Sequence, residues 1–191
     1  MGIKIFSVVS LLFVVGSLSG QSQFDFQRAK WGQSRGDVLA EISTSPDKSG
    51  KLFVTFLNGF ISGFDCDINY YFAEDKLAMG EYLFRKKHSN SNDYVSDYKY
   101  LKSLLEKKYS NTFVETIDWK NTTFKDDPTS IGLAISMGHL EMKAVLETGS
   151  TRIVLLLSGE NLDVQVSLQY QSLSLRDKLK SEFEREDSEN L

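Results

Sequence analysis

Residues 162–170, with the sequence LDVQVSLQY, alternate apolar and polar side chains without a break. Successive side chains of a β-strand point to opposite faces, so one face of this segment is apolar and the other is polar. An antiparallel sheet with one face on a core and one face in water has this pattern. The segment therefore predicts a half-buried strand of an antiparallel sheet.

Short turns connect this strand to others before it. Residues 148–150 and 158–161 are rich in turn-forming residues, and they delimit candidate strands at 139–147 and 151–157. Two further strands are predicted upstream, at 114–120 and 131–136. Because strands that follow one another through tight turns are antiparallel, all of these belong to an antiparallel arrangement.

The first half of the chain has a similar pattern. A β-favouring run at 51–57 ends at Asn58-Gly59, a dipeptide that favours a two-residue hairpin turn. The returning strand covers 60–72, with Gly63 as a predicted bulge, and a third strand covers 76–84. Residues 43–50 are predicted to form a loop.

Three helices are predicted around these strands. Ser34 and Asp37 favour the start of a short N-terminal helix, and Ser174 with Asp177 favours the start of a C-terminal one. The longest helix covers 92–109, with Ser91 or Asn92 as its cap. Its apolar stripe consists of Tyr94, Tyr98, Leu101 and Leu105.

The predicted fold class is α+β. We expect one or more antiparallel sheets with about seven to eight strands in total, one long central helix, a short N-terminal helix and a C-terminal helix. Residues 23–187 are expected to form one α+β domain, either undivided or as two tandem helix–sheet halves at 24–86 and 90–172. Residues 188–191 are expected to form an acidic tail.

The N-terminus has the features of a secretory signal peptide. Lys4 precedes an apolar run at 5–15, which is too short to span a membrane, and small polar residues follow at 16–22. Residues 1–22 are therefore predicted to be removed after Ser19 or Ser22. We expect an exported protein, periplasmic or secreted, without an integral membrane segment after cleavage.

The composition of the chain argues against one class of binding partner and against disulfide bonds. The formal net charge is −4 and the isoelectric point is about 5.3. Proteins that bind nucleic acid usually carry a basic surface, so we expect no nucleic-acid partner. Cys66 is the only cysteine, so no intramolecular disulfide can form. The fold must therefore be stabilised by side-chain packing rather than by a disulfide bond.

Candidate metal ligands are incomplete. Asp65, Asp67 and Asn69 share a strand face and match the opening of a calcium loop, but Tyr70 and Lys76 stand where that loop needs Gly and Glu. His139 and Glu141 share a strand face as well, but two ligands are too few for a metal site. We therefore predict no metal ligand and no cofactor, and interpret the acidic residues as a solvated strand face.

Candidate catalytic residues are equally sparse. Cys66 as a nucleophile needs a base to form the thiolate, and nothing in the sequence places His88 or His139 beside it. A buried, inert thiol is the favoured interpretation. No phosphate loop, nucleophile elbow or zinc motif occurs, so no catalytic residue is predicted.

Two surface features remain. Residues 85–87 together with Lys107 and Lys108 can form a basic patch, although lysines at the C-terminal end of a helix also favour the helix dipole. Tyr71 and Tyr100 lie off the predicted buried stripes, and we expect them on a recognition surface, where tyrosine is enriched.

A short motif near the predicted mature N-terminus adds a resemblance. Phe24-Asp25-Phe26 followed by Trp31-Gly32-Gln33-Ser34 and Val38 resembles the start of a group of uncharacterised exported bacterial proteins with a W-G-x-S-x-x-x-V helix start. At fold level the chain is similar to outer-membrane assembly lipoproteins of the SmpA/OmlA type and to tandem β-lactamase-inhibitor-like modules, but it lacks their lipid-anchor cysteine. The resemblance implies a binding or scaffolding role in the cell envelope.

The sequence thus predicts an exported, non-catalytic interaction or scaffold protein of the bacterial cell envelope with an unknown protein partner. Two alternatives stay open: a lipocalin-like protein that binds a small ligand, and a hydrolase with dispersed carboxylates or His139 in its site. A deep cavity favours the first, converging polar groups in a cleft favour the second, and an exposed apolar patch favours the scaffold.

Overall fold

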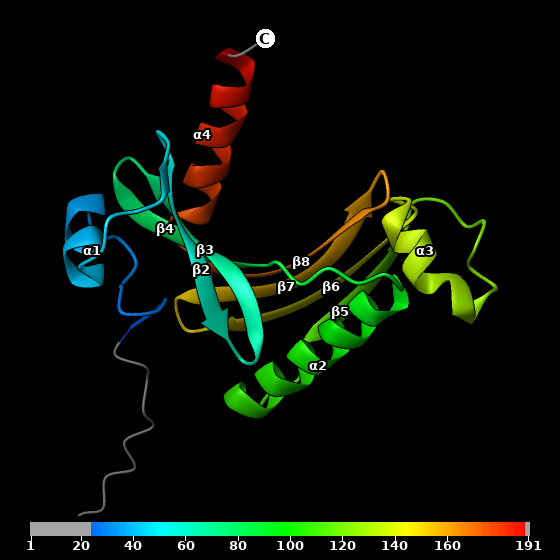
Figure 1. Cartoon of the computed structure of the whole chain (residues 1–191). Helices are drawn as coiled ribbons and strands as arrows, with labels where there is room; N and C mark the ends of the chain where they lie inside the picture. Colours follow the sequence, from blue (N-terminus) through cyan, green and yellow to red (C-terminus); the bar gives the residue numbers. More distant parts are fainter. Residues whose placement is uncertain (1–23, 190–191) are drawn as a thin grey trace, which may run out of the picture.

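One eight-stranded antiparallel sheet organises the part of the chain that the computed structural model describes, residues 24–189 (Figure 1). Its strand order is β1-β2-β3-β4-β8-β7-β6-β5. The strands are β1 (Lys48–Ser49), β2 (Phe53–Ile61), β3 (Phe64–Ala73), β4 (Lys76–Phe84), β5 (Val114–Trp119), β6 (Leu140–Thr148), β7 (Thr151–Glu160) and β8 (Asp163–Ser172). The predicted α+β class with an antiparallel sheet is confirmed.

Four α-helices and one 3₁₀ turn accompany the sheet within the described residues. They are α1 (Arg35–Ile42), α2 (Asn92–Tyr109), the 3₁₀ turn η1 (Pro128–Ser130), α3 (Ile131–Ser136) and α4 (Arg176–Glu189). None of these helices is long and apolar enough to cross a membrane. The predicted signal peptide lies outside the described residues.

Each half of the chain contributes four strands to the sheet. Residues before α2 supply β1–β4, later residues supply β5–β8, and the last strands of the two halves, β4 and β8, pair along the middle of the sheet. In this central pair Gly80 lies opposite Tyr170, and Tyr82 lies opposite Leu168. The sheet is therefore continuous across both halves.

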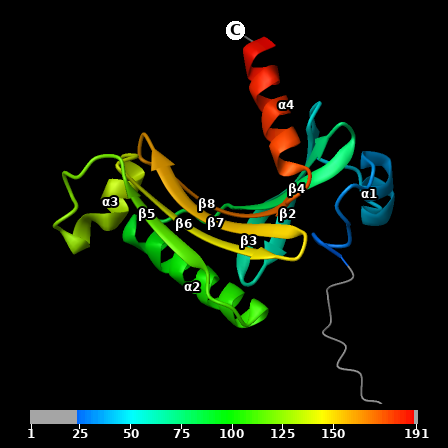
Figure 2. The same cartoon turned by 180° about the vertical axis from the view of Figure 1, so that it is seen from behind.

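The two faces of the sheet carry different cores. The apolar stripe of α2 packs on one face, here called the inner face, and Val38 of α1 belongs to the same cluster. Helix α4 lies on the opposite, outer face, where Leu179 packs with Ala73 and Ala78 (Figure 2). The predicted alternation holds from Val164, because Val164, Val166, Leu168 and Tyr170 are buried in the inner core. Leu162, the fifth apolar residue of the pattern, precedes β8 and is 73% exposed.

The β2–β3 hairpin differs from the prediction. The chain reverses at Ser62-Gly63, whereas Asn58-Gly59 forms a bulge within β2. Both dipeptides can adopt positive φ, at Asn58 (58°), Ser62 (52°) and Gly63 (90°), so local chemistry permits either turn. The observed register places Thr55 opposite Asn69, which tertiary packing favours because the two side chains hydrogen-bond.

The predicted strand at 131–136 is also wrong, because these residues form α3. The side chain of Asp127 accepts hydrogen bonds from the backbone N–H of Thr129 and the hydroxyl of Ser130, which starts the η1 turn. Gly132 then packs against the N-terminus of α2, where its backbone N–H donates to Asn92. These contacts fix a helix that the β-favouring composition does not indicate.

The C-terminal helix is longer than predicted. Helix α4 continues to Glu189, so the residues assigned to the start of an acidic tail at position 188 are helical. Acidic and basic residues at helical spacing support this, as in the pair Lys180–Glu184.

Candidate binding site

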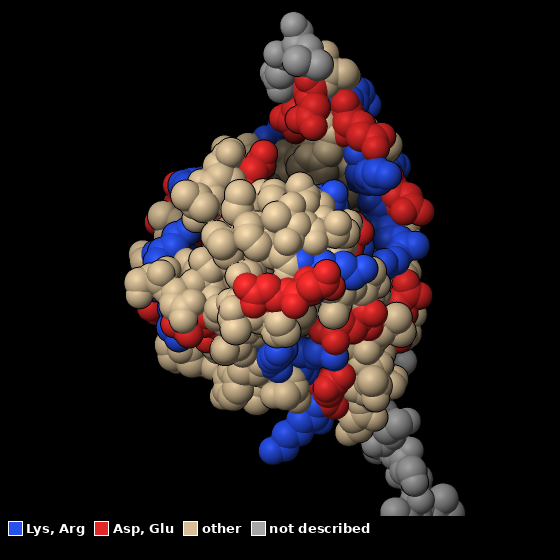
Figure 3. Space-filling view, turned by 90° about the vertical axis from the view of Figure 1, so that its right-hand side faces the viewer, with Lys and Arg blue, Asp and Glu red and all other residues tan. Residues whose placement is uncertain are grey.

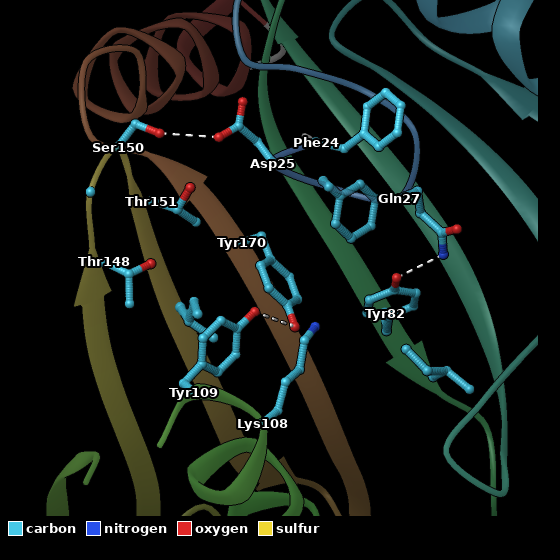
Figure 4. A pocket seen from close by; sticks show the side chains of 14 residues that line it. Phe24, Asp25, Gln27, Tyr82, Lys108, Tyr109, Thr148, Ser150, Thr151 and Tyr170 are labelled. Atoms are coloured by element: carbon cyan, nitrogen blue, oxygen red, sulfur yellow. Dashed lines mark hydrogen bonds between the residues drawn. The ribbon is translucent and has the colours of Figure 1, made fainter. Parts of the chain in front are cut away.

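A pocket of about 670 Å³ opens on the inner face of the sheet, between the segment at 24–27, the C-terminal end of α2 and the turn between β6 and β7 (Figure 4). We call it the tyrosine pocket. Its lining consists of Phe24, Asp25, Phe26, Gln27, Ile61, Tyr82, Lys108, Tyr109, Thr148, Gly149, Ser150, Thr151, Ile153 and Tyr170. Residues far apart in the sequence therefore form a single concave surface.

Hydrogen bonds tie the N-terminal wall of the pocket to the β6–β7 turn. Both carboxylate oxygens of Asp25 are engaged: one accepts from the backbone N–H of Trp31 (2.9 Å) and the other from the hydroxyl of Ser150 (3.1 Å). The indole N–H of Trp31 donates to the hydroxyl of Thr151 (2.8 Å). Asp25 and Trp31 of the N-terminal motif therefore position this wall.

Phe26 closes one side of the pocket. Its ring is buried and packs against Tyr70, Tyr82 and Tyr170 with ring centroids 5.1–5.6 Å apart. The ring lies over Gly80, where a Cβ atom would come within 2.1 Å of it. Only glycine leaves room for the ring at this point of β4.

Three phenol groups lie in the lining of the pocket. The Tyr82 hydroxyl accepts from the side-chain amide of Gln27 (2.7 Å), and the Tyr109 hydroxyl lies 3.5 Å from that of Tyr170. The structure gives the hydroxyl proton of Tyr82 no acceptor among residues 24–189. The contact between Tyr109 and Tyr170 uses one of their two hydroxyl protons and leaves the other for a ligand. Burial raises the pKa of the Tyr82 and Tyr170 phenols, with a smaller contribution from neighbouring phenols, so they remain neutral donors.

Lys108 supplies the positive charge of the pocket. Its ammonium group lies 5.0 Å from the ring centroid of Tyr109 and 5.8 Å from that of Tyr170, in cation–π contact. No carboxylate within the described chain pairs with it. The ammonium group and the neutral phenols can bind a negatively charged group that accepts hydrogen bonds. The aromatic walls can bind an apolar or planar part of the same ligand.

A second pocket, of about 420 Å³, lies on the same face beside α1 and shares Gln27 with the first. We call it the α1 pocket. Its lining consists of Gln27, Arg28, Glu41, Ile42, Thr44, Asp47, Phe56, Leu57, Ile68 and Tyr70. Its walls are apolar, and it carries two carboxylates and one guanidinium.

The three residues predicted as a solvated calcium-like face of β3 have different environments, since Asp65 is exposed whereas the other two make structural contacts. Asp67 pairs with Arg85 (3.3 Å), and Asn69 is buried. No group of three or more His, Cys, Asp or Glu side chains that could hold a metal ion occurs among residues 24–189. His139 stacks on Phe124, and Glu141 pairs with Lys120 (3.7 Å), so these two do not converge on one site.

Cys66 is fully buried on the inner face, as the sequence predicts. Burial, and then the charge of Asp67, raises the pKa of its thiol to about 11, so the thiol is protonated at neutral pH. His88 instead makes a short contact to Asp97 (2.6 Å) and packs against Tyr94. The geometry does not indicate a thiol–imidazole pair.

The predicted basic patch does not form. Arg85 pairs with Asp67, Lys86 with Asp97 (3.5 Å) and Lys87 with Asp163 (2.6 Å), so the run 85–87 is neutralised. Lys108 is separate from that run and lies in the tyrosine pocket. Sequence reasoning missed this role, because lysine at the end of a helix is explained by the helix dipole alone.

Tyr71 and Tyr100, the predicted interaction residues, lie on different parts of the molecule. Tyr71 is on the outer face, where its hydroxyl donates to Glu81 (3.0 Å) and its ring packs against Phe183 of α4. Tyr100 is 52% exposed on α2 and lies near Phe64. The two tyrosines therefore do not form one surface.

A buried polar network crosses the outer face of the sheet. One oxygen of Glu81 accepts from Asn69 (3.0 Å) and Tyr71 (3.0 Å), and the other accepts from Gln169 (2.9 Å). Glu81 is 7% exposed and has no ion-pair partner within the described residues. Both of its oxygens are satisfied, so the network is structural.

Comparison of the chain with protein-family models, with curated proteins and with solved structures finds no match. The function is therefore inferred from the tyrosine pocket and from the sequence.

Proposed function

We propose that the chain is an exported, non-catalytic binding protein of the cell envelope that holds a small anionic ligand in the tyrosine pocket. The observation that carries the proposal is the position of Lys108, whose ammonium group stands over two tyrosine rings without a carboxylate partner in the described residues. The signal-peptide pattern of residues 1–22 supports export.

The shape and chemistry of the pocket support a ligand with two parts. The half-buried side chains of Phe24, Ile61 and Tyr109 offer apolar surface for the body of the ligand, above the buried rings of Phe26, Tyr82 and Tyr170. The Lys108 ammonium and the phenol protons offer charge-assisted and neutral hydrogen bonds to its anionic group. A volume of about 670 Å³ lies in the range of small-molecule sites.

Calorimetric titration with 3-phenylpropanoate tests the proposal, with 3-phenylpropanol as the uncharged control. We expect the carboxylate to bind and the alcohol to bind at least tenfold more weakly. Lys108→Gln should abolish this preference, whereas Lys107→Gln should retain it, because Lys107 is an exposed neighbour outside the pocket. Equal affinity of the parent for acid and alcohol, or an unchanged preference in Lys108→Gln, would contradict the proposal.

A scaffold role has its own supporting observation. Leu133, Met137 and Leu162 are 40%, 44% and 73% exposed, and Leu162 is joined to the end of α3 by a backbone hydrogen bond to Ser136. Figure 3 shows a broad uncharged area at the end of the molecule that carries α3, bordered by charged side chains. Such patches mark protein contacts. Weaker self-association or partner binding in Leu162→Ser, at unchanged stability, would test this second candidate.

A further inference from the structure

The tyrosine pocket and the α1 pocket are neighbours separated by one aromatic ring. In the sheet Gly80 lies between Tyr70 on β3 and Tyr170 on β8, and the ring of Phe26 covers Gly80. Tyr70 lines the α1 pocket and Tyr170 lines the tyrosine pocket. Gln27, the residue after Phe26, borders both pockets.

The charges of the two pockets are opposite. The tyrosine pocket carries Lys108 and Asp25, and both oxygens of Asp25 are already occupied by Trp31 and Ser150, so the charge that it offers a ligand is that of Lys108. The α1 pocket carries Glu41 and Asp47 against a single Arg28. One oxygen of Glu41 accepts from the side chain of Gln33 (3.0 Å), and one oxygen of Asp47 accepts from the backbone N–H of Leu57 (2.8 Å). Neither carboxylate has an ion-pair partner within residues 24–189, so each keeps an oxygen for a cation.

The apolar walls of the α1 pocket suit the aliphatic part of a basic side chain. Ile42, Leu57 and Ile68 line it together with the edge-to-face pair of Phe56 and Tyr70 (5.8 Å). A lysine side chain buries its methylene groups against such walls and holds its ammonium group at a polar rim.

We propose that the two pockets are subsites of one site for a short peptide, with a carboxylate-bearing aromatic end in the tyrosine pocket and a basic side chain in the α1 pocket. This inference rests on the proposed function, because the anionic end occupies the site described above. Gln27 lines both pockets and Arg28 lines the α1 pocket, so the turn at Gln27-Arg28 lies between the two subsites. The backbone N–H groups of these two residues make no backbone hydrogen bond within the described residues.

The reach of a peptide fits two adjacent pockets. Tyr70 and Tyr170 lie on the strands that flank β4, so their backbones are two strand spacings, about 9–10 Å, apart. An extended chain at about 3.3–3.6 Å per residue spans this with three or four residues. A tetrapeptide that carries lysine at one end and a C-terminal phenylalanine at the other is therefore the matched probe.

Calorimetry with three peptides tests the inference. The probe is Lys-Gly-Gly-Phe with a free carboxylate. The second peptide replaces its lysine by N-acetyl-norleucine, which removes the positive charges and keeps the length, and the third is the C-terminal amide of the probe. We expect the probe to bind at least tenfold more tightly than either of the other two.

Charge variants then assign the ends of the peptide. Glu41→Gln/Asp47→Asn keeps the acceptor oxygens that bind Gln33 and Leu57, and should lower the affinity for the probe to that of the acetyl-norleucine peptide. Lys108→Gln should weaken both carboxylate-bearing peptides. The exposed pair Asp118→Asn/Glu160→Gln removes the same number of charges outside both pockets and should change no affinity.

The outcomes separate the two proposals. If the probe and the acetyl-norleucine peptide bind the parent equally, or if Glu41→Gln/Asp47→Asn leaves their difference intact, the two-subsite inference is overturned while binding of 3-phenylpropanoate still supports the proposed function. If neither 3-phenylpropanoate nor any peptide binds, both proposals fail.

Discussion

The ring of Phe26 lies directly over Gly80, so close that a Cβ atom at position 80 would lie 2.1 Å from Cδ1 of the ring. Phe26 belongs to the N-terminal wall of the tyrosine pocket, and Gly80 belongs to β4 in the middle of the sheet. This contact holds the wall against the sheet and divides the tyrosine pocket from the α1 pocket.

Gly80→Ala should therefore displace Phe26. We expect the free energy of unfolding to fall by about 1–3 kcal/mol, as for an overpacked core position. Gly36→Ala in α1 is the control: its Cβ would meet only one atom at 3.8 Å, and a gain of about 0.4–1 kcal/mol is expected. Denaturant melts measure both, and full stability of Gly80→Ala would show that Phe26 is not held over Gly80.

Glu81→Ala should destabilise the outer face of the sheet. The substitution leaves the donors of Asn69, Tyr71 and Gln169 without their acceptor, and each buried unsatisfied donor costs about 1–3 kcal/mol. Glu160→Ala, at an exposed site, should stay within about ±0.5 kcal/mol. Similar urea midpoints for the two variants would contradict a structural role for the network.

Stability should decrease at alkaline pH through Cys66. Burial raises the pKa of its thiol from 9.0 to about 11, so folding favours the protonated form. This contribution is complete below about pH 9 and is lost as the pH rises to about 11. Unfolding free energies of the parent should fall across this range, and those of Cys66→Ala should fall less.

Tyr70 also contributes to the loss of stability at alkaline pH, but at higher pH than Cys66. Burial raises the pKa of its phenol from 10.0 to about 12, so its contribution is lost at higher pH than that of the thiol. Parallel pH profiles for parent and Cys66→Ala between pH 9 and 11 would mean that the thiol does not contribute.

Leu101→Ala should cost about 2–5 kcal/mol, the range for a large-to-small change in a core, because Leu101 is 3% exposed in the inner core. Lys99→Ala on the exposed side of α2 should stay within about ±0.5 kcal/mol. Lys102 forms an ion pair with Glu115 (3.0 Å). Lys102→Ala should therefore lower the free energy of unfolding by about 0.2–1 kcal/mol, more than an isolated surface lysine would. Equal melts for Leu101→Ala and the parent would refute the packing of α2.

We predict that the chain is exported and that its mature form begins at Gly20 or Gln23, because small residues stand one and three places before each cut. N-terminal sequencing of secreted or periplasmic material checks this. Recovery of the chain with Met1 intact would contradict export by a cleaved signal peptide.

Local patterns predicted much of the fold and little of the site. The helix at 92–109 and the strand at 162–170 follow from periodicity, which depends only on neighbouring residues. The turn at Ser62-Gly63 does not follow from local pattern, since Asn58-Gly59 has equal or better turn chemistry. The observed register instead depends on contacts across the hairpin, such as the hydrogen bond between Thr55 and Asn69. Residues 131–136 were misassigned because a short apolar run fits a strand and a buried helix alike.

By itself the sequence determined that this chain forms an α+β fold with antiparallel strands, an apolar stripe on α2 and a buried thiol at Cys66. Only the tertiary structure decided that Lys108, Tyr170 and the segment around Phe26 meet in one pocket. Periodicity assigns a side chain to a face of its own element, but it carries no information about which distant element packs there. In this chain the pairing of β4 with β8 and the space above Gly80 decide which distant segments meet in the pocket.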